Sequence, residues 1–234
     1  MKQYKEEKQK ISKEIAVSRK SPEENNEIKA NEEIKLVWFA DFKGDRVAGV
    51  NRKKEIVWDQ HMGSPPILPA SYATNTEYVT VADDGNLIVA DGDGMMVQEI
   101  DRKTHQLLWQ YGVKDKQDYA GGKIHQPDKS FKISENEILI NDGNNRRVII
   151  VDQDTNKIVW QYGTYRKMGW GPNLLRGNTA VRPIKNATQF VITDTLEKKV
   201  IIVDRATKKI LHRWSFPDAK WIQHAWYTKA GGLA

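Results

Sequence analysis

Two histidines and two arginines are the residues of this sequence best suited to a binding or catalytic site. His125 follows a glycine-containing loop, YAGGKIHQP, and the tripeptide QHA around His224 is similar to HQP at the first position. A histidine can bind an anion or act as a base near neutral pH, and an arginine can hold a carboxylate or sulfate. The candidate catalytic residues are His125 and His224, and the candidate ligand-binding residues are Gln126, Arg176, Arg182 and Tyr72.

Each of these candidates also has a structural interpretation. A histidine can hydrogen-bond the backbone of a neighbouring repeat, and an arginine can pair with an aspartate between repeats. Asp91 and Asp93 are spaced as in calcium loops, but the stretch ADGDGM lacks the further acidic ligands of an EF-hand. We interpret it as a polar turn, and we predict no metal site and no cofactor.

Composition excludes several functional classes. The 234 residues include no cysteine, which rules out disulfides, cysteine-ligated metals and a thiol nucleophile. The sequence has no G-x-S-x-G, no Walker loop and no H-E-x-x-H. The net charge of +6 comes from lysines and arginines scattered among acidic residues, which is typical of a solvated surface rather than a nucleic-acid site. No apolar run is long enough to span a membrane.

A repeat of about fifty residues organises the chain from residue 36 onward. Its first marker is an aspartate that ends a β-rich run, at Asp41, Asp91, Asp142 and Asp194. Later markers are Asp101, Asp152 and Asp204, where each aspartate is expected to close an Asx-turn, and Trp58, Trp109, Trp160 and Trp214 in the last run of each copy. Four copies with such similar offsets predict four structurally equivalent units.

Each unit is predicted to be a four-stranded antiparallel meander, because short β-type runs alternate with polar turn residues. Such a small sheet cannot bury both faces alone, so the units must stack. Radial stacking of four-stranded sheets predicts an all-β fold, the β-propeller. The four units are expected at about 36–63, 69–113, 125–164 and 178–217.

The phrase DQDTNKIVWQYG at 152–163 resembles the repeat of bacterial PQQ-like β-propellers, and HQPDKSFKISENEILINDGNNRRVIIVD at 125–152 resembles an NHL-type unit. The resemblance covers roughly residues 36–217. It implies that the tryptophans pack between neighbouring blades, and it is specific for fold rather than activity. Arylsulfotransferase-like propellers are a more distant resemblance; they would imply a histidine nucleophile with arginines holding sulfate. A PQQ-dependent dehydrogenase would need a stacking tryptophan and a calcium cluster, neither of which we identify.

The two ends of the chain differ from the repeats. Residues 1–34 are rich in lysine and glutamate, which predicts a charged arm, helical or disordered. The first copy lacks an inner strand, and the apolar segment at 221–234 is expected to supply an extra inner strand. The chain is therefore expected to form a partial or open propeller, with closure as four blades or as part of a larger ring as alternatives, and with possible self-association through open strand edges.

The function expected from these observations is that of a non-catalytic binding protein or scaffold. Its partner would be a protein, peptide or glycan held at the loop face of the propeller, with no nucleic acid involved. The alternatives are the arylsulfotransferase-like enzyme and, less favoured, the quinoprotein. The N-terminus lacks the apolar segment of an export signal, which indicates the cytoplasm, whereas a signal encoded further upstream would indicate the cell envelope or secretion.

Overall fold

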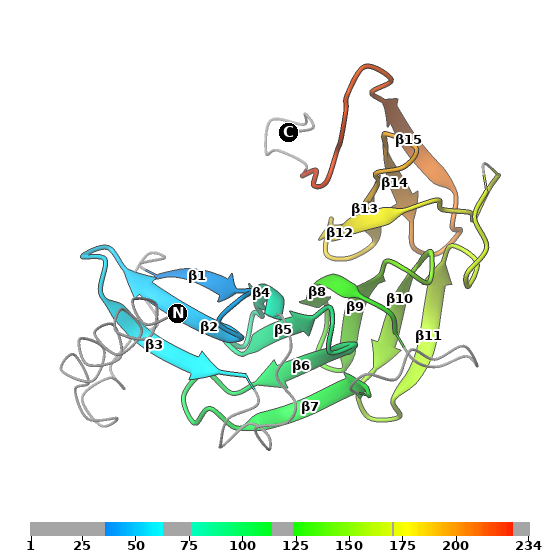
Figure 1. Cartoon of the computed structure of the whole chain (residues 1–234). Helices are drawn as coiled ribbons and strands as arrows, with labels where there is room; N and C mark the ends of the chain where they lie inside the picture. The colour runs from blue at the N-terminus through cyan, green and yellow to red at the C-terminus, as the bar shows by residue number, and fades with distance from the viewer. Residues whose placement is uncertain (1–35, 63–75, 114–123, 170, 227–234) are drawn as a thin grey trace.

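The computed structural model describes residues 36–62, 76–113, 124–169 and 171–226. These residues form β-strands, turns and loops, and they contain no helix. The strands make four antiparallel sheets that follow one another along the chain (Figure 1). The predicted all-β fold of four consecutive sheets is confirmed, while the charged arm at 1–34 and the candidate Tyr72 lie outside the described residues.

The strands are consecutive within each sheet, so each sheet is a simple meander. Sheet 1 contains β1 (Leu36–Asp41), β2 (Arg46–Asn51) and β3 (Ile56–His61). Sheet 2 contains β4 (Thr76–Val81), β5 (Leu87–Asp91), β6 (Met96–Ile100) and β7 (Leu107–Gly112). Sheet 3 contains β8 (Pro127–Lys132), β9 (Glu137–Asp142), β10 (Arg147–Asp152) and β11 (Lys157–Tyr162). Sheet 4 contains β12 (Asn178–Ile184), β13 (Gln189–Asp194), β14 (Lys199–Asp204) and β15 (Ile210–Ser215).

The four sheets follow an open arc, with sheet 1 at one end and sheet 4 at the other (Figure 1). The first strands of sheets 2, 3 and 4, β4, β8 and β12, lie along the inside of the arc, and β8 packs beside both of the others. Sheet 1 has three described strands. Its first, β1, ends at the repeat marker Asp41 and is therefore equivalent to the second strand of the other sheets, so β1 is the innermost described strand of sheet 1. An inner strand for the first repeat is absent from the described residues, and its absence from the whole repeat stays a prediction.

The repeat markers correspond to recurring turns. The turns before β2, β6, β10 and β14 are equivalent in the repeat. Each of them ends with a residue of positive φ, at Asp45, Met95, Arg146 and Lys198. Gly112 and Gly163 have φ of 96° and 90°, and a Cβ on Gly112 would lie 2.1 Å from the carbonyl oxygen of Met95. Glycine is therefore required at these two positions both by the backbone conformation and by the close approach of the preceding turn.

Aspartate side chains close the turn before the last strand in sheets 2, 3 and 4. Asp101 accepts hydrogen bonds from the backbone amides of Lys103 and Thr104 at 2.7 and 2.8 Å. Asp152 and Asp204 each bind the amide and hydroxyl of a threonine three residues on, at 2.8 and 2.6 Å. These bonds hold the pKa of each of the three carboxyls below its usual value. Asx-type turns therefore explain why a short polar residue with an oxygen acceptor recurs here.

Three apolar seams join the four sheets. Val47 of sheet 1 packs with Leu87 and Val89 of sheet 2. The seam between sheets 2 and 3 packs Ile88, Ala90 and Val97 against Ile138, Ile140 and Ile149. The seam between sheets 3 and 4 packs Leu139, Val148 and Ile150 against Val181, Phe190 and Ile192. Because consecutive residues of a strand point to opposite faces, each middle strand contributes to two seams, which explains its unbroken apolar sequence.

The last strand of each of the first three sheets carries a tryptophan that reaches the next sheet. The indole nitrogen of Trp58 donates to the carbonyl oxygen of Arg102 at 2.7 Å, and that of Trp160 donates to the carbonyl oxygen of Arg205 at 2.7 Å. Trp109 donates to the side chain of Asn156 at 2.7 Å. All three acceptors belong to the turn before the outer strand of the following sheet, so each indole joins two sheets by packing and by a hydrogen bond.

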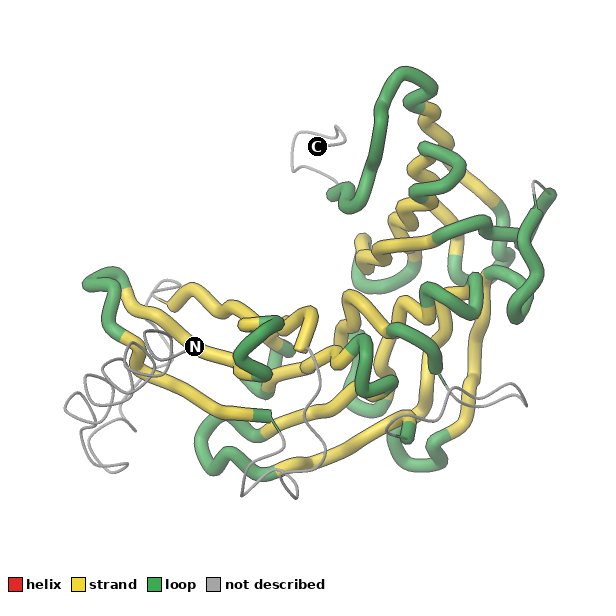
Figure 2. Tube along the Cα trace, in the orientation of Figure 1, coloured by secondary structure: helices red, strands yellow, loops and turns green. Residues whose placement is uncertain are grey.

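The C-terminal segment differs from the expectation. Residues 221–226 form no strand; residues 216–226 form a loop that turns back from β15 toward the centre of the arc (Figure 2). Ile222 and Ala225 pack on Val191 and Val200 of sheet 4, and the hydroxyl of Thr195 donates to the carbonyl oxygen of Ile222 at 2.6 Å. Over these residues the predicted inner strand is wrong, because the apolar side chains cover the outer face of sheet 4 instead of pairing with β1.

Candidate binding site

The inner side of the arc holds a pocket of about 240 Å³. Its walls come from the first strands of sheets 2 and 3, from turns of sheets 3 and 4, and from the C-terminal segment. We call it the central pocket; the side chains that give it its character are those of Glu77, Gln126, Asp128, Asn144, Arg146 and Trp221. Most of this lining is polar or charged, and Trp221 is the large aromatic residue at its wall, with 61% of its surface exposed.

Irregular pairing places the two acidic residues in the central pocket. The register between β4 and β5 shifts at Glu77, between Thr76 and Tyr78, and the register between β8 and β9 shifts between Pro127 and Ser130, where Asp128 lies. A bulge leaves an extra residue unpaired and turns its side chain away from the regular alternation. The same kind of shift occurs in β12 between Asn178 and Ala180, so the irregularity is a feature of the repeat.

The central pocket favours the protonated forms of its carboxyl groups. Burial, followed by the charges of Asp128, Asp93 and Asp91, raises the pKa of Glu77 to about 7. Burial raises the pKa of Asp128 to about 6, although the adjacent Lys129 acts in the opposite direction. Desolvation and like charges both disfavour the carboxylate form, so the pocket has carboxyl groups that titrate close to neutral pH.

A second group of side chains lies next to the central pocket, because Lys129 follows Asp128 in β8. We call Lys129, Arg182 and His224 the cationic cluster. Lys129 has 1% of its surface exposed, and its ammonium forms no hydrogen bond with any residue that the structure describes. Its nitrogen lies 4.5 Å from the ring centroid of Tyr78 and 5.8 Å from that of Trp226. Aromatic faces attract the ammonium but offer it no hydrogen-bond acceptor.

Arg182 and His224 complete this cluster. The guanidinium of Arg182 lies 5.6 Å from the ring of Phe131 and 5.8 Å from that of Trp226. Its Nε atom and Nδ1 of His224 are buried without a hydrogen-bond partner among the described residues. Burial and then the charge of Arg182 lower the pKa of Lys129 to about 8, and burial and then the charge of Lys129 lower the pKa of His224 to about 4. Two cationic groups and a neutral imidazole thus share a weakly hydrated position.

The other sequence candidates are held in separate places. The His125 ring lies 3.4 Å from the side-chain nitrogen of Asn144, and its pKa is lowered by burial and by the charges of Arg166 and Arg146. Gln126 accepts a hydrogen bond from Asn144 and lines the central pocket. Arg176 pairs with Glu197 at 3.0 Å. The structure brings Arg182 and His224 together, but it does not bring His125 or Arg176 to them.

The aspartates that mark the repeat are structural residues. Asp142 has no exposed surface, accepts a hydrogen bond from the amide of His125 at 2.8 Å and pairs with Arg147 at 2.7 Å. Asp194 binds the amides of Arg176 and Gly177 at 2.8 and 2.9 Å. Asp91 binds the amide of Gly94 at 2.7 Å, which makes the stretch ADGDGM a closed turn. Each carboxylate fixes a loop at the inner end of its sheet.

Three residues of the inner surface were missed by the sequence analysis: Glu77, Asp128 and Lys129. The available signal was the presence of charged residues at the start of otherwise apolar or β-type runs, in TEYVTV and PDKSFK. Within the described residues, no group of three or more His, Asp or Glu side chains is arranged to hold a metal ion. No helix in that part of the chain is long and apolar enough to cross a membrane.

No family model matches the sequence, and no curated protein matches it. Solved structures are similar in fold at low sequence identity. The WD40 β-propeller domain of Doa1 gives a TM-score of 0.62 at 9% identity, covering 86% of this chain and 57% of that one. Virginiamycin B lyase from Staphylococcus aureus gives 0.56 at 12% identity, with coverages of 86% and 66%. A protein of unknown function from Bacteroides caccae gives 0.58 at 13% identity, with coverages of 85% and 65%.

The chain has a β-propeller fold. It spans about two thirds or less of the length of these propellers, in keeping with the open arc of four sheets in Figure 1. At such low identities the likeness concerns the fold alone. The sheets of this propeller are blades, and the central pocket and the cationic cluster lie on the inner side of the arc, where β4, β8 and β12 run.

Proposed function

We propose that this β-propeller is a non-catalytic binding protein that holds a protein or peptide partner on the inner side of its arc. The observation that carries the proposal is Trp221, a tryptophan with 61% of its surface exposed at the wall of a polar pocket. Exposed aromatic residues beside charged groups are typical anchors of protein recognition sites. Residues from sheets 2, 3 and 4 and from the C-terminal segment meet there, which suits a ligand that spans several blades.

The charge of the central pocket adds to this support. Glu77 and Asp128 are half-buried carboxyl groups with pKa values of about 7 and 6. A cationic group of a partner, such as a lysine side chain, would favour their ionised forms and would be attracted by them. The pocket volume of about 240 Å³ is suited to one or two side chains rather than to a folded element.

Selection of peptides from a displayed random library tests this proposal. Peptides selected on the full chain are expected to bind Trp221→Ala at least about tenfold more weakly, because truncating an interface anchor costs more than about 1–2 kcal/mol. Leu108→Ala is the matched control, since Leu108 is 50% exposed on β7, at the outer strand of sheet 2. Selected peptides that bind Trp221→Ala and Glu77→Gln as tightly as the unaltered chain would contradict the proposal.

An arylsulfotransferase-like activity is the second candidate, and the neighbouring positions of Arg182 and His224 favour it. His125 and Arg176 lie apart from that pair and have other partners. The enzyme would therefore have to use His224 as the nucleophile with Arg182 alone as the sulfate ligand. Transfer of sulfate from an aryl sulfate donor to a phenol, lost in His224→Ala, would establish this activity in place of simple binding.

A further inference from the structure

The cationic cluster contains a buried ammonium that forms no ion pair with the described residues, although the charge of the adjacent Asp128 favours its protonated form. An ammonium taken out of water without a hydrogen-bonded anion is destabilising, so buried lysines are normally paired. Lys129 is 1% exposed, yet its contacts are the faces of Tyr78 and Trp226. By contrast, Lys132, three residues further along β8, forms ion pairs with Asp84 and Glu99 at 2.8 Å each. Among the described residues, the same strand thus gives Lys132 two ion pairs and Lys129 none.

The described surroundings of Lys129 contain further nitrogen groups that lack a hydrogen-bond partner. Arg182 contributes a guanidinium whose Nε has no hydrogen-bond partner in the described chain, and His224 contributes an imidazole whose Nδ1 has none there either. Lys129 and Arg182 both lie 5.8 Å from the ring centroid of Trp226. Two cations over one ring repel each other, and an anion placed among them would remove that repulsion and supply the missing acceptors.

We propose that Lys129, Arg182 and His224 form a binding site for a carboxylate group that is attached to an apolar or aromatic residue. Such a group is the end of a peptide or an acidic side chain next to a hydrophobic one. The site rests on the proposed function, and it names the part of the partner that the inner surface recognises. Tyr78, Phe131 and Trp226 surround the donors and would contact the apolar part of the ligand.

The charge balance favours a single negative charge. Lys129 and Arg182 carry two positive charges, the adjacent Asp128 carries one negative charge when ionised, and His224 is held neutral. A planar carboxylate also fits the fork of a guanidinium better than a tetrahedral anion does. Trp226 is 46% exposed whereas Lys129 is 1% exposed, so the indole lies between the cluster and solvent, where a ligand would enter.

Direct titration of the full chain with three probes tests the site. N-acetylphenylalanine carries the carboxylate and a ring, its amide carries the ring alone, and phenylmethanesulfonate carries a tetrahedral anion. We expect N-acetylphenylalanine to bind at least about tenfold more tightly than either of the others, because one charged hydrogen-bond partner is worth about that factor. Equal binding of acid and amide, tighter binding of the sulfonate, or no binding of the acid would overturn the proposal.

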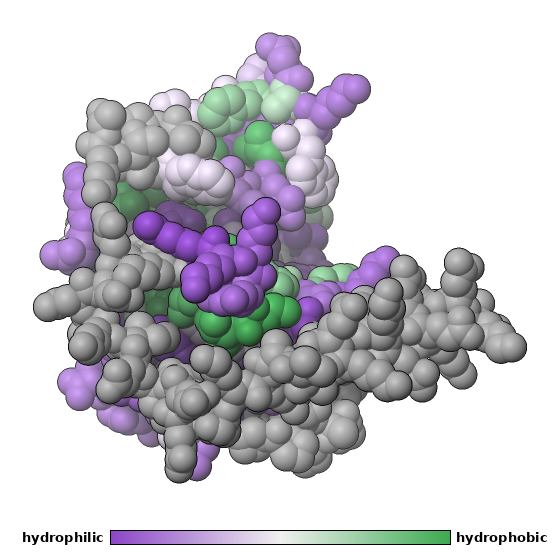
Figure 3. Space-filling view, turned by 90° about the vertical axis from the view of Figure 1, so that its left-hand side faces the viewer, coloured by the Kyte–Doolittle hydropathy of each residue, from purple (hydrophilic) through white to green (hydrophobic). Residues whose placement is uncertain are grey.

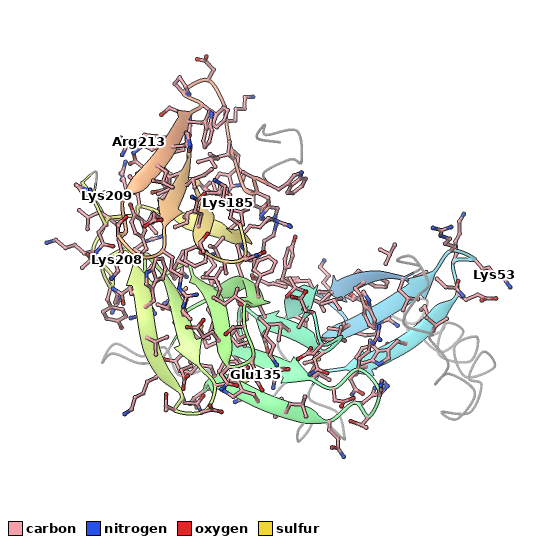
Figure 4. All side chains as sticks on the ribbon, turned by 180° about the vertical axis from the view of Figure 1, so that it is seen from behind. Lys53, Glu135, Lys185, Lys208, Lys209 and Arg213 are labelled. Atoms are coloured by element: carbon pink, nitrogen blue, oxygen red, sulfur yellow. The ribbon has the colours of Figure 1, made fainter. Side chains whose placement is uncertain are left out.

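Proton uptake separates a ligand-binding lysine from a structural one. Since the pKa of Lys129 lies near 8, a carboxylate that binds it raises that pKa, and binding at about pH 8 should take up a proton. Calorimetry in two buffers of different ionisation enthalpy measures this uptake. Lys129→Met should abolish the uptake and weaken binding at least about tenfold, whereas Lys53→Met, in the exposed turn labelled in Figure 4, should change neither.

The two proposals fail in different ways. If peptides selected on the chain depend on Trp221 but bind Lys129→Met as tightly as the unaltered chain, the inner side of the arc is a binding surface and the carboxylate site is wrong. If N-acetylphenylalanine binds with proton uptake but no peptide depends on Trp221, the carboxylate site stands for a small acid and the peptide function is wrong.

Discussion

The seams between the blades and the inner side of the arc differ in whether their polar groups have hydrogen-bond partners. In the seams, polar groups are paired: Trp160 donates to the carbonyl oxygen of Arg205, and Arg205 in turn pairs with Glu137 at 2.6 Å. On the inner side, Nε of Arg182 and Nδ1 of His224 are buried without a hydrogen-bond partner among the described residues. Unpaired buried donors lower the stability of a fold. The seams thus hold the propeller together, and the difference supports the proposal that the inner side binds a ligand.

Trp160→Ala should have the largest effect on stability. Emptying a large aromatic site costs about 3–5 kcal/mol, because the lost contacts leave a cavity. Trp160 also packs on Phe190 at 4.9 Å between centroids, so its loss loosens the seam between sheets 3 and 4. Chemical denaturation measures the change. Val159→Ala is the control, since Val159 is adjacent on β11 but 54% exposed; an equal loss in both variants would show that the seam is not the source.

Ile222→Ala should have the next largest effect, of about 1–2 kcal/mol, because Ile222 is only partly buried. It covers Val191 and Val200 on the outer face of sheet 4, a place that the next blade occupies in a longer propeller. Denaturation of Ile222→Ala beside Lys220→Ala tests the contact, since Lys220 is exposed in the same segment. Equal midpoints for the two variants would mean that this segment adds nothing to the stability of sheet 4.

The two ends of the arc differ in how far their apolar side chains are covered. At the end formed by sheet 1, Val37 and Phe39 are 69% and 36% exposed, and Figure 3, viewed from that side, shows hydrophobic surface in the middle of the face. At the other end, Ile222 and Ala225 cover sheet 4. Sedimentation at rising concentration should show weaker self-association for Val37→Lys than for the unaltered chain, because an exposed apolar strand favours pairing between molecules. Unchanged association would place the contact elsewhere.

Lys129→Met should act in the opposite direction from the seam variants and stabilise the chain by about 1 kcal/mol. Replacing an unsatisfied buried charge by an apolar side chain of similar length removes its desolvation cost. The gain should grow as the pH falls from about 10.5 to about 8, where the unfolded chain binds the proton of Lys129 more tightly than the folded chain, and it should stay level below about pH 8. Thermal melts across pH 7–10 beside Lys53→Met measure it; a loss of stability would show that Lys129 is a structural residue.

Glu77→Gln should have the smallest effect, and only on the dependence of stability on pH. The pKa of Glu77 is raised from 4.5 to about 7, so the folded state binds the proton more tightly than the unfolded state. The contribution of this group to stability is therefore present below pH 4.5 and is lost as the pH rises toward 7. Denaturation between these limits should show a flatter decline for Glu77→Gln, and parallel curves would contradict the raised pKa.

The sequence predicted the repeats better than it predicted the site. Asp152 and its equivalents, together with Trp160 and its equivalents, recur at nearly fixed offsets, because each blade needs the same turns and the same bridge to its neighbour. Candidate site residues had no such recurrence to support them. The structure brings Arg182 and His224 next to Lys129 of sheet 3, but nothing in the sequence indicated that these residues lie together.

The sequence by itself determined that the chain forms four similar antiparallel sheets that follow one another along the chain. These features depend on local alternation and turn residues, which act over a few positions. Only the tertiary structure decided that the C-terminal segment covers sheet 4, and that bulges in β4 and β8 place Glu77 and Asp128 in one pocket. Those outcomes depend on contacts between residues distant in the chain, where packing and burial, rather than local preference, select the arrangement.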